Sequence, residues 1–177
     1  MKKWLYRLMI AFCGMLLFAA CGAKITQFRL ESMEDGGPSL PGAAPQSSLE
    51  EIRESGFPLE EEPLHVRKAG KSALDSEEYL LIAEEAKLKI AGCDTQHCLF
   101  QFVDGRFTCI HVQFTDSDSS TKVSEKLTEL YGEPAVQDTG GGRLEQWSLE
   151  GEQPVQMVVL HRGNSPGSFQ LAYPWFE

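Results

Sequence analysis

The chain has 177 residues, with 16 Lys and Arg against 26 Asp and Glu, so its formal net charge is −10. This length suits one domain with short accessory segments. Because nucleic-acid affinity comes largely from Lys and Arg at phosphate groups, the acidic balance argues against a nucleic-acid partner.

The first twenty residues have the pattern of a secretory signal peptide. Lys2, Lys3 and Arg7 give a positive start, Leu8 to Phe18 is largely apolar, and two alanines follow. This apolar run is shorter than the ~20 residues needed to cross a bilayer. We therefore predict a leader at residues 1–20 that is cleaved. The mature chain would have 157 residues and a formal charge of −13, because the leader removes three cationic and no acidic side chains.

The segment Phe18-Ala19-Ala20-Cys21 resembles the lipobox of bacterial lipoproteins. In that family the cysteine thiol receives a diacylglycerol, commonly with palmitate, and cleavage makes the cysteine the first residue. The resemblance implies a protein anchored through Cys21 on the periplasmic side of the cell envelope. Gly22 replaces the Asp associated with inner-membrane retention, which favours the outer membrane. Phe18 departs from the usual Leu, and an ordinary signal peptide with an unrelated cysteine is the alternative.

Residues 21–47 are predicted to be the anchor cysteine and a flexible spacer. Gly36 to Pro45 consists mainly of Gly, Pro and Ala, a composition that buries little apolar surface. Ile25 to Leu30 is an exception, because it contains strand-forming residues. A single domain is expected over residues 48–177.

The first half of that domain is predicted to contain a short helix and several strands. Ser47 and Glu50 fit a capping box, and Gly56 can end the helix. Asp104-Gly105 lies between two apolar segments and favours a type I′ turn, which predicts a β-hairpin. The predicted strands are 64–68, 78–84, 87–91, 98–103 and 106–114. A helical turn is the alternative at residues 79–82, because this segment is a continuous apolar run.

The second half is predicted to be a helix followed by three strands. Asp116 to Asp118 offer N-caps, Val123 and Leu127 begin an apolar stripe that continues to Leu130 and Tyr131, and Gly132 follows it. The strands are 143–149, 155–161 and 169–173, with a core face of Trp147, Phe169, Leu171 and Tyr173. This order predicts an α+β fold, in which two short helices pack on one face of an antiparallel sheet.

Residues 117–173 are similar to part of small bacterial envelope lipoproteins. The similarity rests on Leu130-Tyr131-Gly132-Glu133-Pro134, followed by a strand with Trp147 and two further strands. The helix-plus-meander domain of the small lipoprotein in the outer-membrane β-barrel assembly machine has a similar arrangement. The resemblance implies a fold only, because a fold does not determine function.

Cysteines and histidines cluster between residues 93 and 111. Cys13 leaves with the leader and Cys21 takes the lipid, so Cys93, Cys98 and Cys109 remain. An oxidising compartment favours disulfides, with Cys93–Cys98 as the main candidate and Cys98–Cys109 as the alternative. If the register follows directly from the Asp104-Gly105 turn, then Cys98, Cys109 and His111 share one face. Thiolates and imidazoles bind zinc and copper, so these three residues form a candidate metal site.

The sequence contains no recognised catalytic motif, and His65 and His161 stand apart from other candidate groups. We therefore predict a non-enzymatic binding or structural domain without a cofactor, anchored by lipid, with an envelope protein as its candidate partner. The alternative is a metal- or redox-binding lipoprotein that uses the cluster from Cys93 to His111.

Overall fold

The computed structural model describes residues 24–32, 37–68 and 74–174. The predicted leader and Cys21 lie outside these residues, so cleavage and lipidation stay predictions. No helix in the described part of the chain has the length and apolar character needed to cross a membrane.

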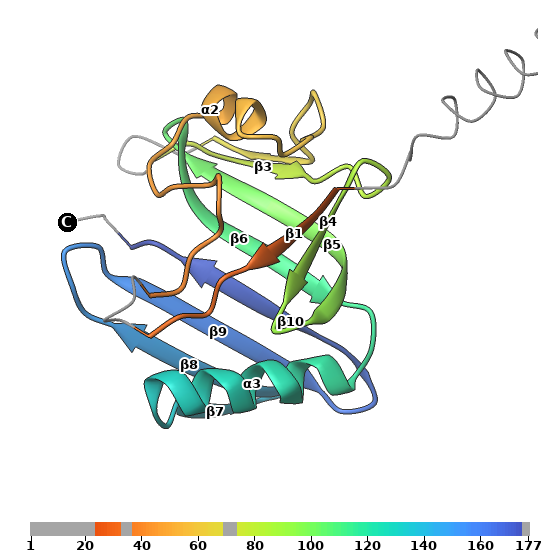
Figure 1. The fold of residues 1–177 in the computed structure, drawn as a ribbon, viewed down its shortest axis with the longest axis vertical. Helices are drawn as coiled ribbons and strands as arrows, with labels where there is room; N and C mark the ends of the chain where they lie inside the picture. Colours follow the sequence, from red (N-terminus) through yellow and green to blue (C-terminus); the bar gives the residue numbers. More distant parts are fainter. Residues whose placement is uncertain (1–23, 33–36, 69–73, 175–177) are drawn as a thin grey trace, which may run out of the picture.

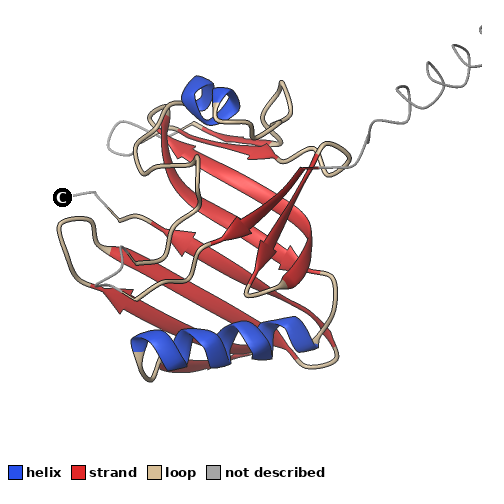
Figure 2. Ribbon diagram, viewed as in Figure 1, coloured by secondary structure: helices blue, strands red, loops and turns tan. Residues whose placement is uncertain are grey.

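The described chain has an α+β fold with a ten-stranded open sheet and two helices (Figure 2), in agreement with the predicted class. The strand order is β1-β4-β5-β6-β10-β9-β8-β7, and β2 and β3 extend the sheet beside β5. In chain order the elements are β1 (Lys24–Phe28), α2 (Leu49–Glu54), β2 (His65–Arg67), β3 (Ser76–Leu80), β4 (Ala86–Ile90), β5 (Cys93–Val103), β6 (Arg106–Phe114), α3 (Asp118–Tyr131), β7 (Ala135–Thr139), β8 (Gly142–Leu149), β9 (Val155–Arg162) and β10 (Ser165–Ala172).

The sheet is mixed, whereas the sequence predicted an antiparallel one. Strand β1 pairs in parallel with β4, from Lys24 beside Ala86 to Phe28 beside Ile90, and the other pairs are antiparallel. The long strand β5 has two neighbours on the same edge, since its start pairs with β4 and its second half pairs with β3. Figure 1 shows β1 and β4 crossing in front of the larger sheet.

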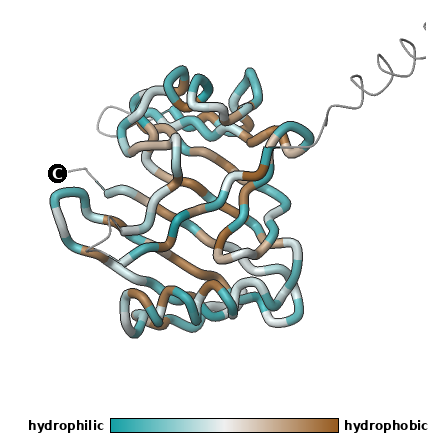
Figure 3. The backbone as a smooth tube through the Cα atoms, in the orientation of Figure 1, coloured by the Kyte–Doolittle hydropathy of each residue, from teal (hydrophilic) through white to brown (hydrophobic). Residues whose placement is uncertain are grey.

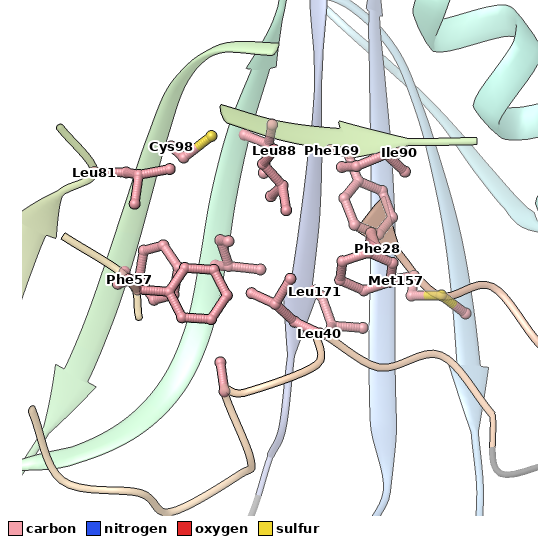
Figure 4. Packing of buried hydrophobic residues seen from close by; sticks show 14 of the residues in the cluster. Phe28, Leu40, Phe57, Leu81, Leu88, Ile90, Cys98, Met157, Phe169 and Leu171 are labelled. Carbon is pink, nitrogen blue, oxygen red and sulfur yellow. The ribbon is translucent and has the colours of Figure 1, made fainter. Parts of the chain in front are cut away.

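The segment predicted to be a flexible spacer contributes to the core in its described part. Phe28, Leu40 and Ala43 are each at most 4% exposed. The Phe28 ring meets the Phe169 ring edge-on, with 5.5 Å between centroids. Figure 4 shows Phe28 and Leu40 among side chains of the sheet. The spacer prediction is therefore wrong here, because a few well-placed apolar side chains outweigh a Gly- and Pro-rich composition.

The helices begin and end close to the predicted residues. The capping box of α2 uses Ser48 and Glu51, one residue later than predicted. Val123 and Leu127 of α3 are fully buried, and the helix packs against β8, β9, β10 and β5. In Figure 1, α3 covers the same face of the sheet as β1 and β4.

The last four strands form a meander. The three predicted strands are present, and Trp147, Phe169, Leu171 and Tyr173 are buried as expected. Figure 3 shows hydrophobic residues gathered in the central strands and hydrophilic ones in the outer turns. Strand β7 was not predicted, because this edge strand is exposed at all five positions and has little apolar character.

Candidate functional site

The cysteine and histidine cluster lies on the β5–β6 hairpin, whose turn confirms the prediction. Asp104 and Gly105 have φ values of 49° and 71°, as a type I′ turn requires. Next to the turn, Phe102 pairs with Phe107, as the turn-derived register predicts. Beyond that pair a β-bulge leaves Thr108 as an extra residue, and the register shifts by one.

This shift separates the residues of the predicted metal site. Cys98 pairs with Val112 and is buried in the core cluster, whereas Cys109 and His111 point to the opposite face of the sheet. Within the described ranges, no group of three or more His, Cys, Asp and Glu residues could hold a metal ion. The metal site predicted from Cys98, Cys109 and His111 is therefore wrong.

The predicted Cys93–Cys98 disulfide is also inconsistent with the hairpin. Cys93, Cys98 and Cys109 are free thiols in the structure. Cys93 and Cys98 lie on one continuous strand, where five residues span about 16 Å, far beyond the ~4.4–6.8 Å between the Cα atoms of a disulfide. The alternative pair, Cys98 and Cys109, lies on opposite faces of the sheet.

The buried thiols are poor nucleophiles and poor metal ligands. Burial raises the pKa of the Cys98 thiol to about 11 and that of Cys109 to about 12. Hydrogen bonds with Thr95 Oγ1, at 3.3 Å from Cys98 Sγ, and from Gln170 Nε2, at 3.2 Å from Cys109 Sγ, only partly offset this effect. Both thiols are therefore protonated at neutral pH and serve as packing groups.

A second feature is the sheet face that lies opposite α3, β1 and β4. Side chains alternate between the two faces along each strand, so the pairing of neighbouring strands shows which side chains share this face. One row of paired residues crosses six strands on this face, and each residue in the row is at least partly exposed. We call this surface the uncovered face. The row runs across β3, β5, β6, β10, β9 and β8 through Leu80, Leu99, His111, Gln170, Val158 and Gln146.

The uncovered face has few acidic side chains, although the whole chain is acidic, and its cationic strand residues include Arg67, Arg106 and Arg162. Among the strand residues that register places there, Glu78 is the only carboxylate. Aliphatic side chains such as Leu144 and Leu160 alternate with neutral amides. The glutamines on this face are Gln101, Gln113, Gln137, Gln146, Gln156 and Gln170.

A shallow pocket of about 270 Å³ opens on the uncovered face between β5, β6, β10 and the end of β9. Burial lowers the pKa of His111, and the negative charge of Glu78 opposes this effect only in part. His111 is therefore neutral at pH 7. The polar side chains that line the pocket are His97, His111, Gln113, Arg162 and Ser168.

A third feature is a buried carboxylate beneath α3. Glu145 is 5% exposed and accepts a hydrogen bond from Ser124 of α3 through Oε2. His161 Nε2 lies 3.0 Å from the same oxygen, and Arg143 lies 2.8 Å from Oε1. Burial raises the pKa of Glu145, but the hydrogen bonds from Ser124 and His161, together with the charges of His161 and Arg143, lower it overall, so the carboxyl is ionised. This cluster joins α3 to β8 and β9.

The cluster around Glu145 does not have the geometry of a serine-hydrolase triad. Ser124 and His161 both contact Oε2 of the carboxylate, whereas a triad requires histidine between serine and acid. His161 was predicted to stand apart from other candidate groups, so this cluster was not predicted from the sequence. The available signal was the two-residue period of β8, because an inward Trp147 implies an inward Glu145.

Comparisons with known proteins give no further guide to the site. No protein-family model matches the chain, and no significant match was found among curated proteins or solved structures. The resemblance of residues 117–173 to envelope lipoproteins therefore stays a prediction.

Proposed function

We propose that this chain is a lipid-anchored lipoprotein of the bacterial cell envelope, without enzymatic activity, that binds another envelope protein through the uncovered face. The sequence before Cys21 supports the anchor, and the composition of the uncovered face supports binding. The outer membrane is the proposed location, because Gly22 follows the cysteine.

The observation that carries the proposal is the scarcity of carboxylates and lysines among the strand residues of the uncovered face. Antiparallel sheets commonly present a polar face to water, and Lys, Glu and Asp are typical of such surfaces. Here aliphatic residues and neutral amides alternate instead, including Leu99, Leu160 and Gln146. Depletion of Lys, Glu and Asp with retention of Arg is a feature of protein interfaces. The proposed partner therefore has an apolar and neutral polar surface.

The titratable groups that the structure brings together favour binding over catalysis. The thiols of Cys98 and Cys109 are buried and protonated, and the carboxylate of Glu145 connects a helix to the sheet. The alternative of metal or redox binding at residues 93–111 loses its support, because the bulge at Thr108 places Cys98 away from Cys109 and His111.

Photo-crosslinking in intact cells tests whether an envelope protein binds the uncovered face. A photoreactive residue at Gln146 or Leu160 should yield a discrete adduct with an envelope protein. The same residue at Glu50 of α2 or Lys122 of α3, both exposed and away from this face, should not. The proposal fails if the face positions give no adduct, or if all four positions give the same adducts.

A separate experiment tests the anchor. In the proposed anchor, the Cys21 thiol receives the lipid and the leader is cleaved just before this residue. Cys21→Ser removes the thiol, so it should abolish labelling by a palmitate analogue and leave an uncleaved precursor of higher mass. Normal processing and detergent partitioning of this variant would contradict the anchor. That result would not bear on binding at the uncovered face, because strand residues of β3, β5, β6 and β8–β10 form this face.

A further inference from the structure

The pocket on the uncovered face gathers hydrogen-bond donors. His97, His111, Gln113, Arg162 and Ser168 line it, and none of the lining residues is a carboxylate. Within the part of the chain that the structure describes, these five side chains form no hydrogen bond or ion pair with one another or with other residues. Each therefore keeps at least one donor available for a ligand.

Three other cationic side chains of the domain are held by oxygen partners within the protein. Arg143 is paired with Glu145 at 2.8 Å, and Arg53 donates to the Glu60 carbonyl oxygen at 2.6 Å. Lys89 is paired with Asp94 at 3.0 Å. Arg162 thus differs from these cations, because it lies at a pocket and has no acidic partner among the described residues.

We propose that this pocket binds an oxyanion, namely the carboxylate or phosphate group of an organic molecule. Guanidinium groups bind both groups through two parallel hydrogen bonds, and imidazole, amide and hydroxyl donors can complete the shell. This inference rests on the proposed function in one respect, because the pocket lies on the uncovered face, which is the proposed binding surface.

The volume of the pocket and its apolar wall favour a small ligand, in which the oxyanion group carries a short apolar substituent. Its volume of about 270 Å³ lies just below the ~300–1,000 Å³ of pockets for drug-sized ligands. Leu99 supplies an apolar wall beside the donors. The negative charge of Glu78 acts on His111, and Gln101 donates a hydrogen bond to Glu78 at 3.4 Å. The anion is therefore placed towards Arg162 and Ser168, away from Glu78.

NMR titration of the full chain in detergent micelles tests the proposal. The probes are inorganic phosphate and acetate, with ionic strength held constant by chloride. The imidazole signals of His97 and His111 should shift and saturate at millimolar probe. Arg162→Gln should weaken binding by about tenfold, the usual effect of losing a charged hydrogen-bond donor. Arg29→Gln is the matched control, because Arg29 is exposed and lies after β1.

The outcomes separate this inference from the proposed function. Shifts that do not saturate, or equal affinity in wild type and Arg162→Gln, overturn the oxyanion site even if crosslinking supports the binding face. Saturable shifts that Arg162→Gln weakens and Arg29→Gln preserves support it. Crosslinking from Gln146 in the Arg162→Gln background then identifies the source of the anion. A lost adduct indicates a carboxylate of the partner protein, and a retained adduct indicates a free organic anion.

Discussion

Leu40→Ala tests whether residues before α2 belong to the folded domain. Leu40 is 2% exposed and packs in the core cluster shown in Figure 4. Truncating a buried leucine to alanine removes its transfer free energy and leaves a cavity, which together cost about 2–5 kcal/mol. Leu40 lies in a loop that can partly collapse, so we expect about 2–3 kcal/mol. For a domain of this size, that loss lowers Tm by about 5–10 °C.

The assay is thermal and urea unfolding of the full chain, followed by circular dichroism. Leu74→Ala provides the matched control, because Leu74 is 50% exposed and a surface substitution changes stability by at most about 0.5 kcal/mol. A flexible spacer would make both leucines equivalent. If the two variants unfold at the same temperature and urea concentration, the packing of this segment into the core is refuted.

The remaining predictions concern the buried carboxylate, the thiols and the hairpin turn. Glu145→Gln should destabilise the domain by about 1–3 kcal/mol at pH 7, because it weakens a buried hydrogen-bond cluster. The folded-state pKa of Glu145 is lowered, so this stabilisation is present above the unfolded pKa near 4.5 and is lost as pH falls through the folded pKa. Urea unfolding at pH 7 and at pH 3 should therefore show a smaller difference from wild type at pH 3, and a constant difference would contradict the role of its charge. Cys98 and Cys109 should react with iodoacetamide in urea but only slowly in the native state, and reduction should not change the intact mass. A two-dalton mass increase on reduction would instead reveal a disulfide. Gly105→Ala should cost about 1 kcal/mol because φ is 71°, whereas Gly140→Ala, which meets no neighbouring atom, should be nearly neutral in the same unfolding assay.

Local sequence signals predicted the elements of this fold well. The Asp104-Gly105 turn, the stop at Gly132 and the buried Trp147 each follow from interactions within a few residues or from a short period. The bulge at Thr108 does not, because the extra residue is accommodated by pairing across two strands and changes no local preference. This single extra residue places Cys98 and His111 on opposite faces of the sheet, so the predicted metal site does not form.

Long-range packing accounts for the other differences between the predictions made from the sequence and the structure. The segment around Leu40 has the composition of a spacer, and only the sheet to which it packs makes it part of the core. The pocket gathers His97, His111 and Arg162 from three strands, and the strand order that brings β10 beside β6 determines this proximity. No pattern within the sequence specifies that order.

The place of β1 also changes how the domain would sit at a membrane. Strand β1 begins at Lys24, three residues after the proposed anchor, and three extended residues span about 10 Å. Pairing with β4 fixes β1 in the domain, so a lipid on Cys21 would hold the domain close to the bilayer rather than at the end of a spacer. Because β1 crosses the covered face of the sheet, the uncovered face lies on the side of the sheet away from β1 (Figure 1). With the proposed lipid on Cys21 in the membrane, the uncovered face would therefore remain accessible to the proposed partner.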